Sequence, residues 1–293
     1  MVGAMKKAFL CIHGFGNHPG GRHHGFSSKL RDGVTALLGD DIVWEEVFWD
    51  DLLGSPSSMS PVELALETPP LVRAFYEGKD GEAIRLRVAE AVNAASDKAG
   101  GAPVVVVGHS MGGAIAYETL AEKPVPSGCS LVMLAPPMGL FNHPEEYLDK
   151  AAGHLGHGIG NFVRNFRLGH LAAELAHFPH VKGDRLPETM PAVSFRSQKD
   201  WFAVPLGEPF PDVSELEVEP PHGTRGIDNH RFYWGDPDVA ASVAAAAVRA
   251  ASDAGEPPTT DMEMKLLAKA AMNSLFAPSR SGEDESGEWG EDY

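Results

Sequence analysis

The 293-residue sequence contains only two cysteines and has no long apolar run. Two cysteines are too few for a disulfide scaffold, and we expect Cys11 and Cys129 to be reduced thiols in the core. No apolar stretch reaches the length of about 18 residues that a membrane-spanning helix needs. The apolar run at residues 8–12, which follows Lys6 and Lys7, is too short for the core of a signal peptide. These absences predict a cytoplasmic protein without stable membrane insertion.

Basic residues are also scarce relative to acidic ones. The chain has 24 Lys and Arg residues against 41 Asp and Glu residues, which gives a formal net charge of −17 at pH 7. Such a surface repels nucleic acid and anionic membranes, so neither is expected as a main partner. Residues 281–293 hold six of the acidic residues and no basic one, which predicts a solvated, disordered tail.

The hydrophobic pattern predicts about six short strands with helices between them. The apolar runs do not alternate with polar residues, which is typical of strands covered on both faces of a parallel sheet. Caps and stop signals support the helices, such as Gly39 after one of them and Asp236-Pro237 before another. Strands that alternate with helices indicate a doubly wound α/β domain. The expected strands are residues 8–12, 42–49, 104–107, 131–134, 193–195 and 216–218, and the expected helices are residues 27–38, 81–98, 111–122 and 237–253.

Two segments interrupt this alternation. Residues 139–190 have no strand signal but carry apolar residues at helical spacing, which predicts a helical cap inserted into an α/β core of residues 1–138 and 191–255. A linker and a C-terminal helix occupy residues 256–280, and this helix begins with the capping box Thr260-Asp261-Met262-Glu263. The helix can dock on the body or on a partner, and the sequence does not decide between them.

The strongest chemical signal is the segment Gly108-His109-Ser110-Met111-Gly112-Gly113. It follows an all-valine strand and precedes a helix, which is the setting that a Gly-x-Ser-x-Gly nucleophile elbow requires. In such a turn a strained serine exposes its hydroxyl, and the small neighbours avoid Cβ clashes. The helix that begins at Met111 directs free N–H groups and its positive dipole end to the same point. We therefore predict that Ser110 is a nucleophile rather than a residue of an ordinary glycine-rich turn.

With this elbow, the sequence resembles the α/β-hydrolase superfamily, and its lipase- and esterase-like members most closely, over most of residues 8–253. The resemblance implies an α/β-hydrolase fold: a mainly parallel sheet of about six strands without the first two superfamily strands, helices on both faces, and a helical cap insertion. The segment His13-Gly14-Phe15-Gly16 follows the first strand, where family members carry an oxyanion loop. By resemblance, the backbone N–H groups of Phe15 and Met111 form the oxyanion hole and His13 shapes the loop.

The resemblance also implies an acid and a base, because family members carry nucleophile, acid and histidine in that order along the chain. Asp200 follows a late core strand and is the predicted acid, while Glu208 and Asp212 lie further from the end of that strand. Two histidines, His222 and His230, follow the last strand. His230 is preferred because a tyrosine lies three residues after it, as in many lipase-like sequences, and His222 stays open as an alternative.

The predicted function is a serine hydrolase, carboxylesterase or lipase-like, that cleaves carboxylic esters through an acyl-enzyme intermediate. His13 and His109 beside the elbow, together with Phe162 and Phe166 in the cap, are the predicted substrate-binding residues. The apolar side chains of the cap favour a small-molecule ester with an apolar group. A thioesterase or an amidase would use the same triad, and a non-catalytic hydrolase-fold binding protein is the alternative from another class.

No cofactor and no metal are expected. The histidine pairs His154-x-x-His157 and His177-x-x-His180 in the cap have a spacing that suits a metal ion, but no cysteine or acidic partner has a matching spacing. Neither the natural substrate nor the oligomeric state follows from the sequence.

Overall fold

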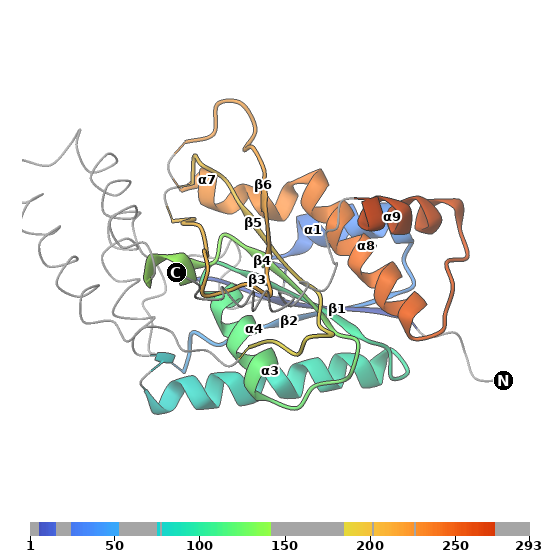
Figure 1. The fold of residues 1–293 in the computed structure, drawn as a ribbon, viewed down its shortest axis with the longest axis horizontal. Coiled ribbons are helices and arrows are strands. Elements are labelled where there is room, and N and C mark those ends of the chain that lie inside the picture. The colour runs from blue at the N-terminus through green and yellow to red at the C-terminus, as the bar shows by residue number, and fades with distance from the viewer. Residues whose placement is uncertain are drawn as a thin grey trace, which may run out of the picture.

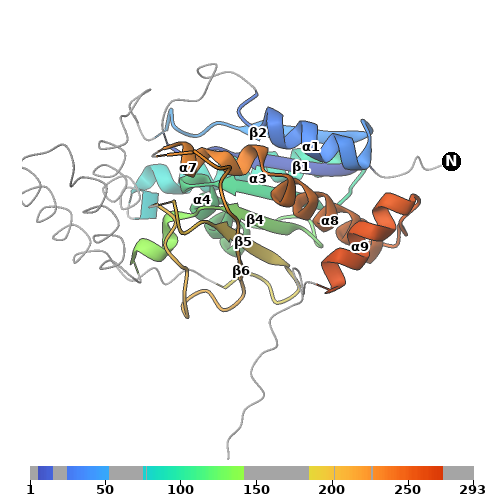
Figure 2. The same ribbon diagram turned by 90° about the horizontal axis from the view of Figure 1, so that it is seen from above.

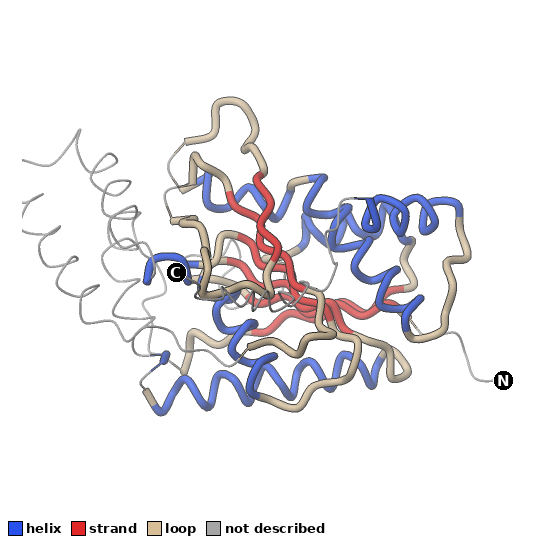
Figure 3. Tube along the Cα trace, viewed as in Figure 1, coloured by secondary structure: helices blue, strands red, loops and turns tan. Residues whose placement is uncertain are grey.

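A computed structural model describes residues 6–15, 25–52, 75–76, 78–141, 185–200, 202–225 and 227–272. The described residues form one parallel sheet with the strand order β2-β1-β3-β4-β5-β6 (Figures 1 and 3). Its strands are β1 (Lys7–Ile12), β2 (Ile42–Val47), β3 (Val104–His109), β4 (Ser130–Leu134), β5 (Ala192–Arg196) and β6 (Ser214–Glu217).

All six predicted strands are present, with ends that differ by a few residues. β2 ends at Val47, before the predicted end at Trp49, because Trp49 leaves the sheet and its indole Nε1–H donates to the carbonyl oxygen of His13 at 2.8 Å. β3 is longer than predicted and includes His109, which pairs with Leu134 of β4. The strand that precedes the elbow therefore extends to the residue immediately before Ser110.

Helices cover both faces of the sheet (Figures 1 and 2). One face packs against α3 and α4, and the other face packs against α1 and α8. This arrangement confirms the predicted α/β fold. The helices are α1 (Ser28–Leu38), α3 (Lys79–Lys98), α4 (Met111–Glu122), α7 (Asp228–Arg231), α8 (Pro237–Asp253) and α9 (Asp261–Met272), with short 3₁₀ helices η1 (Pro137–Phe141) and η2 (Phe232–Gly235).

The predicted start of α3 at Gly81 is wrong. The helix begins at Lys79, after Gly78, and Gly81 lies in its first turn. A Cβ atom on Gly81 would lie 1.8 Å from the carbonyl oxygen of Phe75. This glycine therefore serves a close approach between helix and backbone, which the sequence pattern does not reveal.

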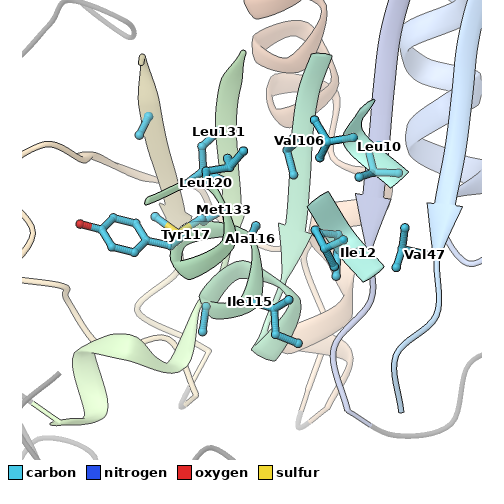
Figure 4. Close-up of a cluster of buried hydrophobic side chains, with 14 of the residues drawn as sticks. Leu10, Ile12, Val47, Val106, Ile115, Ala116, Tyr117, Leu120, Leu131 and Met133 are labelled. Atoms are coloured by element: carbon cyan, nitrogen blue, oxygen red, sulfur yellow. The ribbon is translucent and has the colours of Figure 1, made fainter. Parts of the chain in front are cut away.

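The core lies in two layers because successive strand residues point to opposite faces. Leu10 and Val106 belong to the cluster beneath α3 and α4, while Phe9 and Val107 belong to the cluster beneath α1 and α8. Figure 4 shows the first cluster, where α4 contributes residues such as Leu120 against the strands. The continuous apolar runs of the sequence thus supply both layers at once.

Both cysteines are buried and form no disulfide, as predicted. Burial raises the pKa of Cys129 to about 11 and also raises that of Cys11. These thiols are therefore protonated at neutral pH, and a protonated thiol is a poor nucleophile.

The C-terminal helix docks on the body, which answers the question that the sequence left open. Helix α9 packs against α8, and its Leu266 is buried. The predicted capping box is present, since the Thr260 N–H donates to Glu263 Oε2 at 3.0 Å and the Glu263 N–H donates to Thr260 Oγ1 at 3.1 Å. Glu263 also forms an ion pair with Lys7 of β1, at 2.5 Å.

We expect the Glu263→Gln substitution to destabilise the protein at neutral pH. Burial raises the pKa of Glu263, but hydrogen bonds from Lys7 and Thr259 outweigh it and lower this pKa to about 2, from 4.5 for an isolated group. A depressed carboxyl pKa contributes stability above the unfolded value, and this contribution is lost as the pH falls toward 2. The shift corresponds to about 3 kcal/mol at most, and screening by solvent at this ion pair reduces the stabilisation below that limit.

Urea denaturation checks this expectation. The free energy of unfolding of the variant should lie below that of the wild type at pH 7, and the difference should shrink as the pH falls from 4.5 toward 2. Asp261→Asn, at an exposed position of the same helical turn, is the matched control and should change stability little. An equal loss in both variants, or a loss independent of pH, would contradict the assignment.

Some predicted segments fall largely outside the described residues. Residues 142–184 hold most of the predicted cap, and the predicted tail at residues 281–293 also lies outside. The boundaries of the cap and the tail therefore stay predictions. In the part of the chain that the structure describes, no helix has the length and apolarity needed to cross a membrane.

Candidate active site

Ser110 lies at the sharp turn between β3 and α4. Its backbone has φ 52° and ψ −126°, a conformation that costs an L-residue strain. The turn is held in place because the Ser110 N–H donates to the carbonyl oxygen of Leu134 at 2.8 Å, and the Gly113 N–H donates to the Ser110 carbonyl at 2.8 Å. The side chain is mostly buried, with 7% of the residue exposed. The sequence pattern and the strained geometry of an elbow thus coincide at this residue.

The glycines of the elbow occupy positions where no side chain fits. A Cβ atom on Gly108 would lie 2.3 Å from the carbonyl oxygen of Gly112. A Cβ atom on Gly112 would lie 2.4 Å from the carbonyl oxygen of Ile12, so the first turn of α4 touches the end of β1. The close approach of these backbones brings the loop after β1 next to the serine.

That loop passes directly beside Ser110. A Cβ atom on Gly14 would lie 2.6 Å from Ser110 Cβ and 3.3 Å from Ser110 Oγ. Phe15 follows Gly14, and its side chain packs edge-on against Trp49 with ring centroids 4.9 Å apart. On the other side, Met111 is the first residue of α4, where backbone N–H groups lack an acceptor within the helix. The structure therefore brings the Phe15 and Met111 backbone segments to the same serine.

His13 is enclosed by aromatic rings. It is fully buried, and its imidazole stacks on the Trp49 indole with ring centroids 5.3 Å apart. Burial lowers the pKa of His13. The Nδ1–H donates to the carbonyl oxygen of Gly14 at 2.6 Å. These contacts support a role in shaping the loop, while a contact of His13 with substrate stays a prediction.

Asp200 and His230 form a buried pair. Asp200 follows β5, is completely buried, and accepts a hydrogen bond from His230 Nδ1 at its Oδ2 atom, at 2.9 Å. Its other oxygen accepts from the Phe202 N–H at 3.0 Å. Because Nδ1 carries the proton in this bond, Nε2 of the neutral ring is an acceptor. Nε2 is buried and has no hydrogen-bond partner within the described residues.

The other candidates for acid and base lie elsewhere. His222 is exposed in the turn that follows β6, and Glu208 is exposed in the segment before it. Asp212 is half-buried, and its charge raises the pKa of Tyr117 on α4. The structure therefore pairs Asp200 with His230, and it does not bring His222, Glu208 or Asp212 into that pair.

His109 connects the elbow to the segment that carries His230. Its Nε2 lies 2.5 Å from the carbonyl oxygen of His230, so Nε2–H is the donor of this bond. The two imidazole centroids are 4.8 Å apart, and Phe202 packs on His230 with centroids 4.6 Å apart. Because His109 directly precedes Ser110, this bond ties the residue before the elbow serine to His230. The side chain predicted to bind substrate thus bonds to protein backbone.

Tyr233 contacts the buried pair, which the sequence pattern did not predict. The tyrosine hydroxyl donates to Asp200 Oδ2 at 3.0 Å, the same oxygen that accepts from His230. Burial and the neighbouring Asp200 charge raise the pKa of Tyr233, so the phenol stays protonated. The signal in the sequence was the spacing of three residues between His230 and Tyr233. Residues three apart on a helical turn point to the same side. That spacing helped to select His230 but assigned no partner to the tyrosine.

The predicted cap residues Phe162 and Phe166 lie outside the described residues, as do the four histidines of the two cap pairs. Among the residues that are described, His, Cys, Asp and Glu side chains form no group of three or more that could hold a metal ion.

Comparison with known proteins shows which family the chain belongs to. No curated protein matches the sequence. Among solved structures, the chain is similar to a proline iminopeptidase of Mycobacterium smegmatis (19% identity over 85% of this chain and 91% of that one, TM-score 0.40). It is also similar to a pyrethroid hydrolase from Sphingobium faniae JZ-2 (15% identity, 82% and 96%, TM-score 0.40). A third similar structure is a thioesterase from the prodiginine biosynthetic pathway in Streptomyces coelicolor (19% identity, 82% and 91%, TM-score 0.35).

These TM-scores are all below 0.5, so they carry no weight for the family or the function. The family model of the alpha/beta hydrolase fold, in contrast, matches residues 7–190, which is more than half of the chain. These residues include β1, the loop beside Ser110, and the elbow itself. The chain belongs to the alpha/beta hydrolase fold family.

Proposed function

We propose that this protein is a serine hydrolase, carboxylesterase or lipase-like, that cleaves carboxylic esters through an acyl-enzyme intermediate. The observation that carries the proposal is the buried hydrogen bond between Asp200 and His230, which leaves His230 Nε2 as an acceptor without a partner among the described residues. His109, which directly precedes Ser110, donates to the backbone carbonyl of His230. An imidazole oriented by a buried carboxylate, with its second nitrogen able to accept a proton, is the group that activates a serine hydroxyl.

In the proposed reaction, Ser110 Oγ attacks the ester carbonyl carbon and His230 Nε2 accepts the hydroxyl proton. The Asp200 carboxylate stabilises the imidazolium through Nδ1 and keeps the ring in the required tautomer. The tetrahedral intermediate collapses, and the alcohol leaves with the proton from Nε2. Water, deprotonated by the same nitrogen, then attacks the acyl-enzyme, and the acid is released as the proton on Nε2 returns to Ser110 Oγ.

The proposed oxyanion hole consists of the backbone N–H groups of Phe15 and Met111. Its support is the position of Gly14 against Ser110 on one side and the first turn of α4 on the other. Removing one such donor from a serine hydrolase costs about 3 kcal/mol of transition-state stabilisation. Backbone donors are held by the fold, so they need no reorganisation as the negative charge develops.

The buried polar groups argue against a purely structural or binding role. Asp200 and His230 are both removed from water, and the imidazole has a nitrogen without a partner in the described part of the chain. Burial of an unsatisfied polar atom is destabilising, and sites that keep one generally use it. A non-catalytic binding protein would gain stability by replacing this pair with apolar side chains.

The proposed substrate is a small-molecule ester with an apolar group. This part of the proposal comes from the sequence, where Phe162 and Phe166 belong to the predicted cap. A thioesterase and an amidase would use the same serine, histidine and aspartate. Turnover of a matched ester, thioester and anilide distinguishes among these substrate classes.

Labelling with a fluorophosphonate probe, followed by mass analysis of the labelled peptide, tests the proposal. We expect one adduct, on Ser110, because only an activated serine attacks the phosphorus at an appreciable rate. Hydrolysis of p-nitrophenyl esters from acetate to laurate then measures the chain-length preference, with a thioester and an anilide of the same acyl group as matched substrates. An unlabelled, folded protein would exclude a serine hydrolase, and faster thioester or anilide cleavage would correct the substrate class.

A further inference from the structure

We propose that Tyr233 is a positioning residue for the base: its phenol shares Asp200 Oδ2 with His230. The shared bond orients the carboxylate and weakens the stabilisation that the carboxylate gives to the imidazolium. This inference rests on the proposed function. It concerns a buried group that the mechanism above does not use.

The geometry places three donors on one carboxylate. The Phe202 N–H donates to Oδ1 at 3.0 Å, while His230 Nδ1–H and the Tyr233 hydroxyl donate to Oδ2 at 2.9 Å and 3.0 Å. These donors come from the loop after β5, from α7 and from η2. Both Asp200 and Tyr233 are completely buried, so water does not compete for these lone pairs. The carboxylate is therefore fixed in one orientation by groups from separate segments.

The phenol is the donor of this set that a single substitution can remove. The phenol is a donor towards Asp200, because its proton stays on the oxygen. Burial, followed by the Asp200 charge, raises the pKa of Tyr233. A hydrogen bond to a carboxylate stabilises the negative charge and reduces the potential that the carboxylate exerts on other donors. With the phenol present, the imidazolium receives less stabilisation than a carboxylate free of that bond would supply. Removing the hydroxyl should make the imidazole more basic.

Other polar and charged groups in the described part of the chain also face this cluster. His109 of β3 lies with its ring 6.3 Å from Tyr233 and 4.8 Å from His230. The charge of Arg196 at the end of β5 and the backbone of Ser197 act on Tyr233 in the direction opposite to Asp200. None of these groups is altered by a change of Tyr233 to phenylalanine. A change in titration behaviour of that variant therefore reports the phenol itself.

The test compares Tyr233→Phe with Tyr117→Phe, each of which removes one hydroxyl from a buried ring. Tyr117 lies on α4, in the core on the opposite face of the sheet, and packs edge-on against Phe210. For both variants, kcat and KM for p-nitrophenyl acetate are measured from roughly pH 5 to pH 9, the range in which histidine titrates. The titration midpoint of the His230 ring is followed in parallel by proton NMR, with its signal assigned from a His230→Gln spectrum.

We expect Tyr233→Phe to move the midpoint of the pH–rate profile upward by about 0.5 to 1 pH unit, to lower kcat about ten-fold, and to leave KM nearly unchanged. The NMR midpoint should move in the same direction. Tyr117→Phe should keep the wild-type midpoint even if it lowers the unfolding temperature. A Tyr233→Phe variant that is folded and retains the wild-type midpoint, or a Tyr117→Phe variant with an equal shift, would overturn the inference.

Failure of the inference is distinguishable from failure of the proposed function. If the wild type is neither labelled by the fluorophosphonate nor active on any ester, the proposed function fails, while the NMR titration still measures how the phenol affects the imidazole. If the wild type is active and labelled on Ser110 but the midpoint does not move in Tyr233→Phe, only the positioning role fails.

Discussion

Replacement of Ser110 by alanine is expected to lower kcat/KM for a p-nitrophenyl ester by roughly 10⁴-fold or more. The variant loses the only group proposed to form the acyl-enzyme, so the remaining reaction is attack by water in a site that keeps the proposed oxyanion donors. The structure indicates that the fold survives, because the elbow is held by backbone bonds from Ser110 N–H to Leu134 and from Gly113 N–H to Ser110. These bonds do not need the hydroxyl.

The measurement is the initial rate of ester hydrolysis with purified variant, together with thermal unfolding and fluorophosphonate labelling. Ser194→Ala is the matched control, since Ser194 is a buried serine on β5 that lies in the sheet rather than at the elbow. The control should keep both turnover and labelling. Undiminished turnover in a folded Ser110→Ala variant would contradict the serine mechanism.

The second large effect concerns the base. His230→Ala is expected to lower kcat/KM by about 10³-fold to 10⁴-fold, because the serine loses its proton acceptor and the leaving alcohol loses its proton donor. The rise of the rate with pH that a histidine base produces should disappear as well. The structure supports this expectation through the Asp200 bond to Nδ1 and the buried, unpartnered Nε2.

His222→Ala serves as the control for that experiment. His222 is exposed in a turn, so we expect its substitution to change kcat/KM and the pH profile little. Both variants are assayed across the same pH range and checked for folding by circular dichroism. A large loss in His222→Ala, with activity retained in His230→Ala, would reverse the assignment of the base.

Local patterns were sufficient for much of the fold. Residues 104–107 and the segment 111–122 were recognisable because a buried parallel strand and a buried helix have characteristic runs of apolar side chains. The start of α3 was predicted two residues too late because Asp80 is a typical N-cap residue, whereas the helix begins at Lys79 and Gly81 packs against the Phe75 carbonyl.

At the candidate site, too, contacts between chain neighbours were predictable and contacts between distant residues were not. The elbow at Ser110 is local, since strand, turn and helix are consecutive in the chain, and it was predicted from six residues. Chain order narrowed the base to two histidines but could not separate them, because their distances to Asp200 depend on how the segment after β6 folds back. The hydrogen bond from Tyr233 to Asp200 spans 33 residues, and no local pattern encodes it.

By itself, the sequence determined the succession of strands and helices along the chain, the glutamate that caps α9, and the turn that carries Ser110. Each of these depends on neighbours within a few residues. Only the tertiary structure decided that α9 docks on α8, that His230 rather than His222 pairs with Asp200, and that His109 and Tyr233 support this pair. The physical reason is the range of the forces involved. Hydrophobic periodicity and capping act along the chain, whereas a buried hydrogen bond needs two groups within about 3 Å of each other, and only the packed sheet and its loops bring them there.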